Sequence, residues 1–449
     1  MLRDTIAAIS TAHGGAALSV VRVSGPDALG VCGRVFRARR PLTELAPRTA
    51  FRACAADSSG RAFDEGLVLV FHGPASFTGE DLVEFHGHGG MLVTQMTLEA
   101  LLAAGARAAG PGEFTQRAYL NGKMDLTQAE AVMDLIHAHS TLALRAANEQ
   151  LGGAIGREAA ALKEELLPVL AHVEAFIDFP DEDITPDTGA ALAARMQSVV
   201  SRARGLVATS EQGRILRQGA RTVICGEPNV GKSSLLNLLS GFERAIVSPA
   251  AGTTRDTIEE FIQVHGIPLR LVDTAGLREG GDDVERTGMD RARRELERAD
   301  LVLEVVDGSR PPERRVEMPA ALQGRRLLVL NKADLGISEA WQDSADAIPL
   351  SCATGEGVEA LREAVRSVIM RSGPMQADHP VAVNARHKEC FARVAVRTEA
   401  ALAALRADAA PEFVALDLRE ALQALGEVVG AVDVEQVLDI IFSSFCIGK

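Results

Sequence analysis

The sequence is poor in cysteine, lysine and aromatic residues, and it has no long apolar run. Its six cysteines include no Cys-x-x-Cys pair, which argues against a zinc site or a disulfide framework. No stretch reaches the length of a membrane span and no signal peptide is evident. We therefore expect a cytoplasmic protein without a membrane span. With 449 residues, of which 47% are hydrophobic, the chain has ample core for about three domains.

The charge balance is acidic, with a formal net charge of −14. Contacts to RNA phosphates favour a basic surface, so any RNA contact must be local or shared with a partner. Arginine is the default cation, because only six of the 47 basic residues are lysine. Four of these lysines, Lys123, Lys232, Lys332 and Lys449, fall in the motifs described below, where a compact ammonium group is wanted.

A phosphate-binding loop lies between an apolar strand and a helix. The strand Thr222-Val-Ile-Cys225 is followed by Gly226-Glu-Pro-Asn-Val-Gly-Lys-Ser233. Backbone N–H groups of such a loop surround a phosphate. Lys232 is expected to reach the outer phosphates and Ser233 to bind Mg²⁺. The sequence therefore predicts a nucleoside triphosphate site.

The identity of the base follows from Asn331-Lys-Ala-Asp334, which ends the apolar strand Leu327–Leu330. The Asp334 carboxylate can accept two hydrogen bonds from guanine, whereas adenine offers neither donor. GTP is therefore expected rather than ATP. Lys332 is expected to lie along the base, and Ser351-Cys-Ala353 to offer a backbone N–H to the guanine oxygen.

Two further segments, Gly252-Thr-Thr-Arg-Asp256 and Asp273-Thr-Ala-Gly276, are typical of the switches of a GTPase. Thr254 offers a hydroxyl to Mg²⁺, Asp273 holds a magnesium-bound water, and the Gly276 N–H bonds the γ-phosphate.

The residue after the second switch motif is Leu277, where a Ras-like enzyme has a glutamine that orients water. Glu285, in the acidic run 282–286, is the candidate to orient or activate that water. The alternative is that this run is a solvated acidic loop.

Charge neutralisation in the transition state also needs a source. The side-chain carbonyl of Asn229 can ligate a monovalent cation, and backbone carbonyls of 248–253 can complete the cage. The full set of expected GTP-binding residues is Asn229, Val230, Gly231, Lys232, Ser233, Ser234, Ser248, Pro249, Ala250, Ala251, Gly252, Thr253, Thr254, Asp273, Thr274, Ala275, Gly276, Asn331, Lys332, Asp334, Ser351, Cys352 and Ala353.

With these motifs the chain resembles, over essentially its full length, the MnmE (TrmE) family of tRNA modification GTPases. The segments outside the GTPase motifs that carry the resemblance are Val21–Gly25, Ser76–Asp81, Glu84–Gly90, Pro111–Ala118, Asn121–Leu126 and the ending Cys446-Ile-Gly-Lys449.

The resemblance implies a K⁺-stimulated GTPase that forms a homodimer and a heterotetramer with the FAD-dependent flavoprotein MnmG (GidA). The reaction it implies places a (carboxymethyl)aminomethyl group on C5 of the wobble uridine of certain tRNAs. A tetrahydrofolate derivative, 5-formyl- or 5,10-methylene-tetrahydrofolate, is the implied one-carbon donor. The implied folate contacts are Arg22, Glu84, Lys123 and Lys449, and the implied K⁺ ligands are Asn229, Ser248, Ala250 and Thr253.

Cys446 lies four residues from the end of the sequence. A free cysteine is often a small buried apolar residue. The resemblance and the nearby Lys449 instead favour a functional, catalytic thiol.

We expect a multidomain fold. An α+β N-terminal folate-binding and dimerisation domain spans 1–121, and an all-α helical domain is formed by 122–217 and 377–449. An α/β P-loop GTPase (Ras-like) domain, 218–376, is inserted between the two helical parts. We also expect the tail from Val383 to pack on the first helical part.

The first helical part should begin with the capping box Thr127-x-x-Glu130.

Two alternatives of a different class remain at this stage. A GTPase switch in ribosome assembly shares the GTPase motifs, but should carry an RNA-binding module with basic surroundings, such as a Gly-x-x-Gly domain. A folate-binding protein with a regulatory GTPase domain would bind its ligands without modifying tRNA.

Overall fold

The computed structural model describes residues 4–12, 14–179, 189–242, 260–272, 295–311, 320–342, 344, 346–370, 383–431, 438, 441–442 and 445–448. The chain forms two compact units, and each is described by itself. The first comprises Met1–Met133 with Val429–Lys449, and the second Asp134–Val428.

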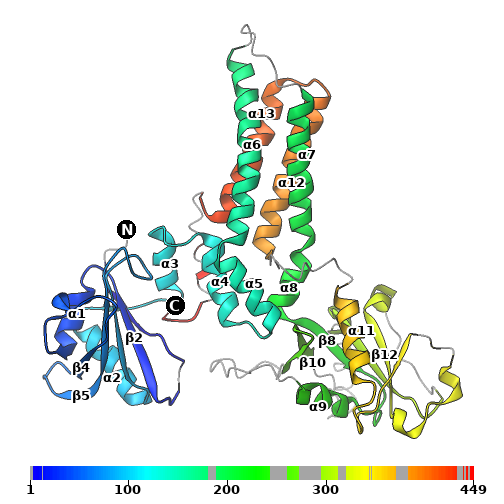
Figure 1. The fold of residues 1–449 in the computed structure, drawn as a ribbon, viewed down its shortest axis with the longest axis horizontal. Coiled ribbons are helices and arrows are strands. Elements are labelled where there is room, and N and C mark those ends of the chain that lie inside the picture. The colour runs from blue at the N-terminus through cyan, green and yellow to red at the C-terminus, as the bar shows by residue number, and fades with distance from the viewer. Residues whose placement is uncertain are drawn as a thin grey trace, which may run out of the picture. The chain divides into compact units, whose positions relative to one another are not determined.

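The first unit is built on a mixed, mainly antiparallel sheet (Figure 1). Its strand order is β3-β4-β5-β6-β2-β1-β7, with β1 and β7 parallel. The strands are β1 (Ile6–Ile9), β2 (Leu18–Ser24), β3 (Phe36–Ala38), β4 (Phe51–Ala56), β5 (Ala62–Phe71), β6 (Leu82–His88) and β7 (Arg107–Ala108).

Alternation along these strands divides the sheet into two faces. One face carries Val23, Val68 and Phe85, and packs on α1 (Ala28–Val35) and α2 (Met91–Ala103). A short 3₁₀ helix, η1 (Leu42–Glu44), closes this core. Polar side chains therefore lie on the other face, where the candidate site is found.

The first unit continues into α3 (Glu113–Leu120) and α4 (Leu126–Ile136). The expected cap of α4 is wrong by two residues. The Gln128 N–H donates to the Asp125 side chain over 2.9 Å, and the Gln128 side chain accepts from the Asp125 N–H over 3.0 Å. This reciprocal pair is a capping box that begins at Asp125, and the Thr127 hydroxyl donates to the same carboxylate.

The second unit contains a sheet of order β13-β12-β11-β8-β10-β9, in which only the β9–β10 pair is antiparallel. Its strands are β8 (Ala220–Cys225), β9 (Glu260–Val264), β10 (Ile267–Val272), β11 (Leu301–Asp307), β12 (Arg326–Asn331) and β13 (Ala347–Pro349). The helical segments around it are α9 (Lys232–Phe242), η3 (Ala320–Arg325), η4 (Ala333–Leu335), η5 (Glu339–Trp341) and α11 (Val358–Met370). The central strands are nearly continuous apolar runs, as expected for parallel strands buried on both faces.

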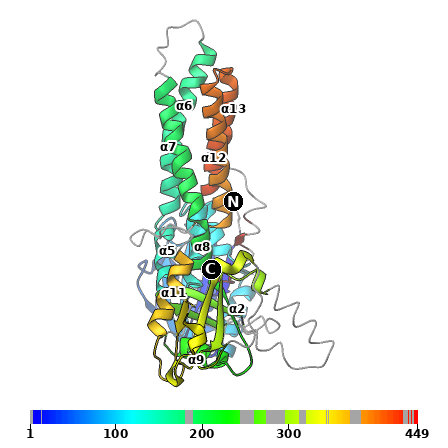
Figure 2. The same cartoon turned by 90° about the vertical axis from the view of Figure 1, so that its right-hand side faces the viewer.

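A helical bundle completes the second unit. Its helices are α5 (Thr141–Leu151), α6 (Ala154–Asp178), α7 (Gly189–Ala208), α8 (Ser210–Gln218), α12 (Ala385–Arg406) and α13 (Pro411–Val429). The long helix α12 packs along α7, and both views show α6, α7, α12 and α13 side by side (Figures 1 and 2). The tail from Val383 therefore packs on the first helical stretch, as predicted. Among the described helices, none is long and apolar enough to cross a membrane.

Candidate functional site

The loop after β8 has the conformation expected of a phosphate-binding loop. Gly226 and Gly231 have φ values of 143° and 100°. A Cβ atom on Gly226 would lie 2.1 Å from the Val305 carbonyl oxygen, so only glycine fits there. Helix α9 begins at Lys232, whose Nζ donates to the carbonyls of Gly226 and Glu227 over 3.0 and 2.6 Å. The first N–H groups of α9 and the Lys232 ammonium thus lie at one loop, where they suit an anionic ligand.

Asn331 connects this loop to the segment predicted to contact the base. Its side chain is 3% exposed. Its Nδ2–H donates to the Val230 carbonyl over 2.7 Å, and its Oδ1 accepts from the Cys352 N–H over 3.1 Å. The Ser351 N–H donates to the Glu356 carbonyl. The segment 351–353 was predicted to supply one N–H to the guanine oxygen, and two of its three N–H groups, those of Ser351 and Cys352, are engaged within the protein.

The predicted base-reading carboxylate, Asp334, is exposed and oriented by its neighbours. The Ser351 hydroxyl donates to Asp334 Oδ1 over 2.6 Å, and the Thr354 N–H donates to the same hydroxyl. A second acceptor oxygen, Oδ2, is left to face solvent or ligand. The end of the motif is thus held in place by the loop that follows β13.

Asp307 is a site residue that the sequence reasoning missed. It ends β11, pairs with Asn331 across the parallel register, and contacts the Lys332 ammonium over 2.6 Å. Burial alone would raise the pKa of Asp307, but hydrogen bonds from Lys332 and Ser309 hold it below its ordinary value. The available signal was a polar residue at the end of Leu301–Val306, a run that is apolar except for Glu304, much like the pattern that marked Asn331.

A cavity of about 300 Å³ lies next to the phosphate-binding loop. Asn229, Asp307, Lys332 and Trp341 line it. The Trp341 indole N–H donates to the Arg310 carbonyl over 2.8 Å, which fixes this wall. Ser233, Ser234 and Ala353 are also described, and the remaining predicted residues of the nucleotide site lie outside the described residues: Ser248, Pro249, Ala250, Ala251, Gly252, Thr253, Thr254, Asp273, Thr274, Ala275, Gly276 and Glu285.

A second cluster forms on the polar face of the sheet in the first unit. Arg22 in β2 lies directly opposite Glu84 in β6, and its Nη2 and Nε donate to Glu84 Oε1 over 2.7 and 3.0 Å. His86 Nε2 lies 3.2 Å from Glu84 Oε2. Burial would raise the pKa of Glu84, but the charge and hydrogen bonds of Arg22 lower it below its ordinary value. The carboxylate is therefore ionised at neutral pH.

Two aromatic rings flank this ion pair. The Arg22 guanidinium carbon lies 5.4 Å from the centre of the Phe77 ring and 5.7 Å from that of Phe114. Lys123 donates to the Pro74 carbonyl over 2.8 Å, on the loop that carries Phe77. The structure thus gathers Arg22, Glu84 and Lys123 on one domain, while Lys449 lies outside the described residues.

The C-terminal segment returns to the same unit. The Gly112 N–H donates to the Cys446 carbonyl over 3.3 Å, and Ile447 forms a β-bridge with Pro111. The Ser10 hydroxyl donates to the Gly448 carbonyl over 3.1 Å. Cys446 is exposed, which excludes the buried-packing alternative for its thiol.

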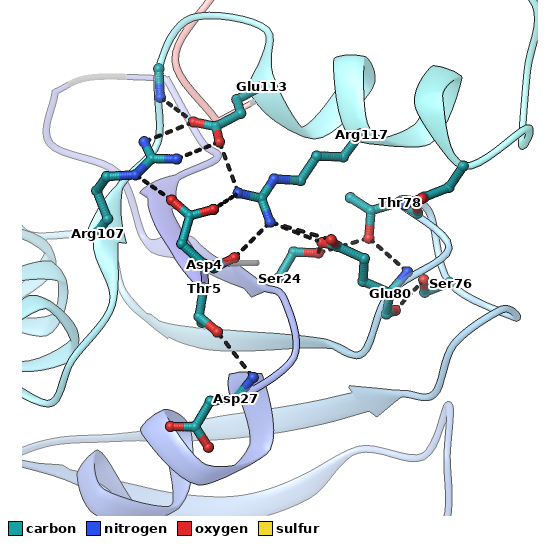
Figure 3. Close-up of polar contacts among 12 residues, drawn as sticks. Asp4, Thr5, Ser24, Asp27, Ser76, Thr78, Glu80, Arg107, Glu113 and Arg117 are labelled. Carbon is teal, nitrogen blue, oxygen red and sulfur yellow. Dashed lines mark hydrogen bonds and ion pairs between the residues drawn. The ribbon is translucent and has the colours of Figure 1, made fainter. Parts of the chain in front are cut away.

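A buried ionic network supports this cluster (Figure 3). The Arg117 side chain is 1% exposed and contacts Asp4, Glu80 and Glu113 at 2.8, 3.2 and 2.9 Å. Arg107 binds the carboxylates of both Asp4 and Glu113. The network therefore joins the start of the sheet, the loop 76–81 and helix α3. Phe77 lies on that loop and Phe114 on α3. The sequence reasoning used these segments only as motifs and missed their ionic contacts.

The glycine-rich loop between β8 and α9, tied to Asn-Lys-Ala-Asp at the end of β12, defines a P-loop GTPase. The chain also matches two family descriptions, the GTP-binding protein TrmE N-terminus over residues 5–123 and the MnmE helical domain over residues 126–446.

Curated relatives match along the whole chain. The tRNA modification GTPase MnmE of Akkermansia muciniphila is 52% identical, with 99% of each chain covered, and that of Thermus thermophilus is 44% identical, with 100% of this chain and 99% of the relative covered. Among solved structures, the G domain of the T. maritima FeoB iron transporter is 27% identical over 33% of this chain and 96% of its own, with a TM-score of 0.24. The chain belongs to the MnmE family of tRNA modification GTPases. The predicted fold class is thereby confirmed, while the boundaries of its domains remain predictions.

Proposed function

We propose that this chain is a K⁺-stimulated GTPase that works with the FAD-dependent flavoprotein MnmG. Together they would place a (carboxymethyl)aminomethyl group on C5 of the wobble uridine of certain tRNAs, with a tetrahydrofolate derivative as one-carbon donor. One observation carries the proposal. This member of the MnmE family has both a nucleotide site with guanine-type motifs and the separate Arg22–Glu84 cluster. The protein would act in the cytoplasm, as a homodimer and in a heterotetramer with MnmG.

In the nucleotide site, Asp334 would accept hydrogen bonds from the guanine N1–H and amine. Because the N–H groups of Ser351 and Cys352 are engaged, the Ala353 N–H is the proposed donor to the guanine oxygen. Lys232 would turn from the loop carbonyls to the outer phosphates, and Ser233 with Thr254 would hold Mg²⁺.

Hydrolysis needs a positioned water and a cation. Leu277 cannot orient water, so Glu285 takes this role in the proposal. Asn229 has a φ of 64° in the phosphate-binding loop and lines the adjacent cavity, which suits its proposed role as a K⁺ ligand beside Ser248, Ala250 and Thr253. The ion would neutralise charge that develops on the phosphates.

The chemistry of the Arg22–Glu84 cluster suits a pterin ring. An ionised carboxylate accepts hydrogen bonds from the ring's N–H groups, and the half-buried ring of Phe77 offers flat apolar surface beside it. The folate, when bound, supplies the one-carbon unit. Lys123 and Lys449 would contact its carboxylates, and Cys446 would serve the modification step as a thiol.

GTP turnover by the purified chain in matched KCl and NaCl buffers tests the proposal. We expect several-fold or greater stimulation by KCl. Equal slow rates in the two salts would contradict the roles of Asn229 and Glu285 and favour a ribosome-assembly switch instead.

A further inference from the structure

One stretch of the first unit is strongly basic in an otherwise acidic chain. Residues 34–61 contain seven arginines but only two carboxylates, Glu44 and Asp57, whereas the whole chain carries a net charge of −14. Five of these arginines form a set that we name the edge arginines. They are Arg37, Arg39, Arg40, Arg52 and Arg61, and all are exposed.

The edge arginines lie along one border of the sheet. Strand β3 is its outermost strand, and Ala38 pairs with Ala53 of β4, so Arg39 and Arg40 follow β3 at the level of Arg52. Arg37 lies in the middle of β3, and a Cβ atom on Gly60 would lie only 2.7 Å from its Nη2, so this guanidinium reaches the turn that carries Arg61. Residues from two strands and a turn therefore build one basic surface.

Most of this positive charge is uncompensated within the unit. Among the described residues, only Arg52 of the set forms an ion pair, with Glu65. The Asp57 carboxylate accepts hydrogen bonds from Ser59 and from the backbone of Arg61, and the Arg61 charge is among the causes that lower its pKa. Asp57 therefore serves the β4–β5 turn and partly balances Arg61, whereas Arg37, Arg39 and Arg40 have no carboxylate contact among the described residues.

In the helical bundle, by contrast, several arginines contact carboxylates. Examples are Arg202 with Glu158, Arg393 with Glu427, and Arg419 with Glu174.

We propose that the edge arginines form a docking surface for the phosphate backbone of the tRNA substrate. Guanidinium groups bind phosphate oxygens in a bidentate, charge-assisted manner. The surface would position the RNA without reading its sequence, because phosphate contacts carry no base information. The docking surface rests on the tRNA-modifying function proposed above. It explains how a chain with a net charge of −14 can contact RNA, because the contact is confined to one basic surface.

The test measures binding of fluorescently labelled tRNA to the full-length chain by anisotropy, at salt concentrations from about 50 to 200 mM. The test variant replaces three edge arginines that have no ion pair among the described residues, Arg39→Ala, Arg40→Ala and Arg61→Ala. The matched control replaces three exposed arginines elsewhere, Arg145→Ala, Arg195→Ala and Arg406→Ala, and so removes the same net charge. GTP turnover without tRNA and the thermal unfolding midpoint should stay unchanged in both variants.

We expect the test variant to bind tRNA at least about tenfold more weakly, with a salt slope shallower by about 2 to 3, because each lost phosphate contact removes about 0.7 to 0.9. The control should bind like the unmodified chain. Equal losses in the two variants, or no loss in the test variant, would overturn the docking surface while leaving the tRNA function standing. An unmodified chain that binds no tRNA would overturn the docking surface as well, and failure to modify tRNA with the flavoprotein present would separately overturn the proposed function.

Discussion

The side chain of Asn331 is bonded to the backbone of Val230, so the base-recognition motif and the phosphate-binding loop are joined by a buried 2.7 Å hydrogen bond. The two residues are 101 positions apart in the sequence. Because the same amide also accepts from Cys352, one side chain sets the distance between the phosphate and base ends of the nucleotide site.

Removing the Asn331 side chain should lower both the stability of the fold and the affinity for GTP. Asn331→Ala leaves the buried Val230 carbonyl and the Cys352 N–H without their partner, at a cost of about 1–3 kcal/mol in the free energy of unfolding. GTP affinity, measured by calorimetric titration, should fall at least about tenfold. Asn148→Ala, on the exposed face of α5, is the control and should change neither quantity. Unaltered GTP affinity in Asn331→Ala would contradict the role of this side chain in holding the two ends of the nucleotide site together.

Base selectivity should depend on the Asp334 carboxylate. Asp334→Asn replaces an acceptor of two guanine hydrogen bonds by a group that offers donors, and charged hydrogen bonds are worth about 1.5–3 kcal/mol each. We therefore expect GTP and GDP affinities to fall at least about 100-fold. Asp346→Asn, an exposed aspartate nearby in the sequence, should bind GTP normally. Comparable affinities in the two variants would show that Asp334 does not read the base.

The buried Arg117 network should dominate the stability of the first unit. Arg117→Met leaves Glu80 and Glu113 without their buried partner, and breaking such a pair costs about 3–5 kcal/mol. Arg39→Met, on the exposed sheet edge, should stay within about 0.5 kcal/mol of the unmodified chain. Scanning calorimetry measures both, and a small effect at Arg117 would mean that the network is dispensable.

The same network makes stability depend on acid. The hydrogen bonds of Arg107, with those of the Gly110 N–H and Arg117, outweigh burial and lower the pKa of Glu113 from its ordinary value of 4.5. A carboxyl group with a lowered pKa stabilises the fold when ionised, so its contribution is fully present above about pH 4.5 and is lost as the pH falls through its value in the folded state.

The contribution of Glu113 to the unfolding midpoint should therefore be nearly constant from pH 7 down to about pH 4.5, and should fall between about pH 4.5 and pH 3. Glu113→Gln should flatten that fall, whereas the exposed Glu44→Gln should not. If the unfolding midpoint falls equally steeply in the two variants, Glu113 does not cause the loss of stability in acid.

Cys446 should matter for tRNA modification and not for GTP turnover. It lies on the first unit, beside Gly112 and exposed, whereas the nucleotide loop belongs to the second unit. Cys446→Ser is therefore expected to hydrolyse GTP at the normal rate and to yield no modified uridine by nucleoside mass spectrometry. Full modification by this variant would show that the reaction does not need the thiol.

Local patterns revealed the GTPase part well, because its motifs are contiguous and sit where apolar strands end. The strands β8 and β12 lie where their apolar runs predicted them. Long-range ionic contacts were not predictable in this way: Arg117 meets Asp4, 113 positions away, only because helix α3 packs on the start of the sheet. The predicted start of α4 was wrong for a local reason. Asp125 and Thr127 are both good N-cap residues, and the sequence alone does not rank them.

The central claim is that GTP hydrolysis by this chain drives tRNA modification, and reconstitution tests it most directly. The chain, the flavoprotein, a tetrahydrofolate donor, unmodified tRNA and GTP in KCl are combined, and the wobble nucleoside is quantified by mass spectrometry. We predict C5-modified uridine with the unmodified chain, and little with Glu285→Ala, which should still bind GTP but turn it over slowly. Equal modification by both proteins, or modification without GTP, would contradict the account.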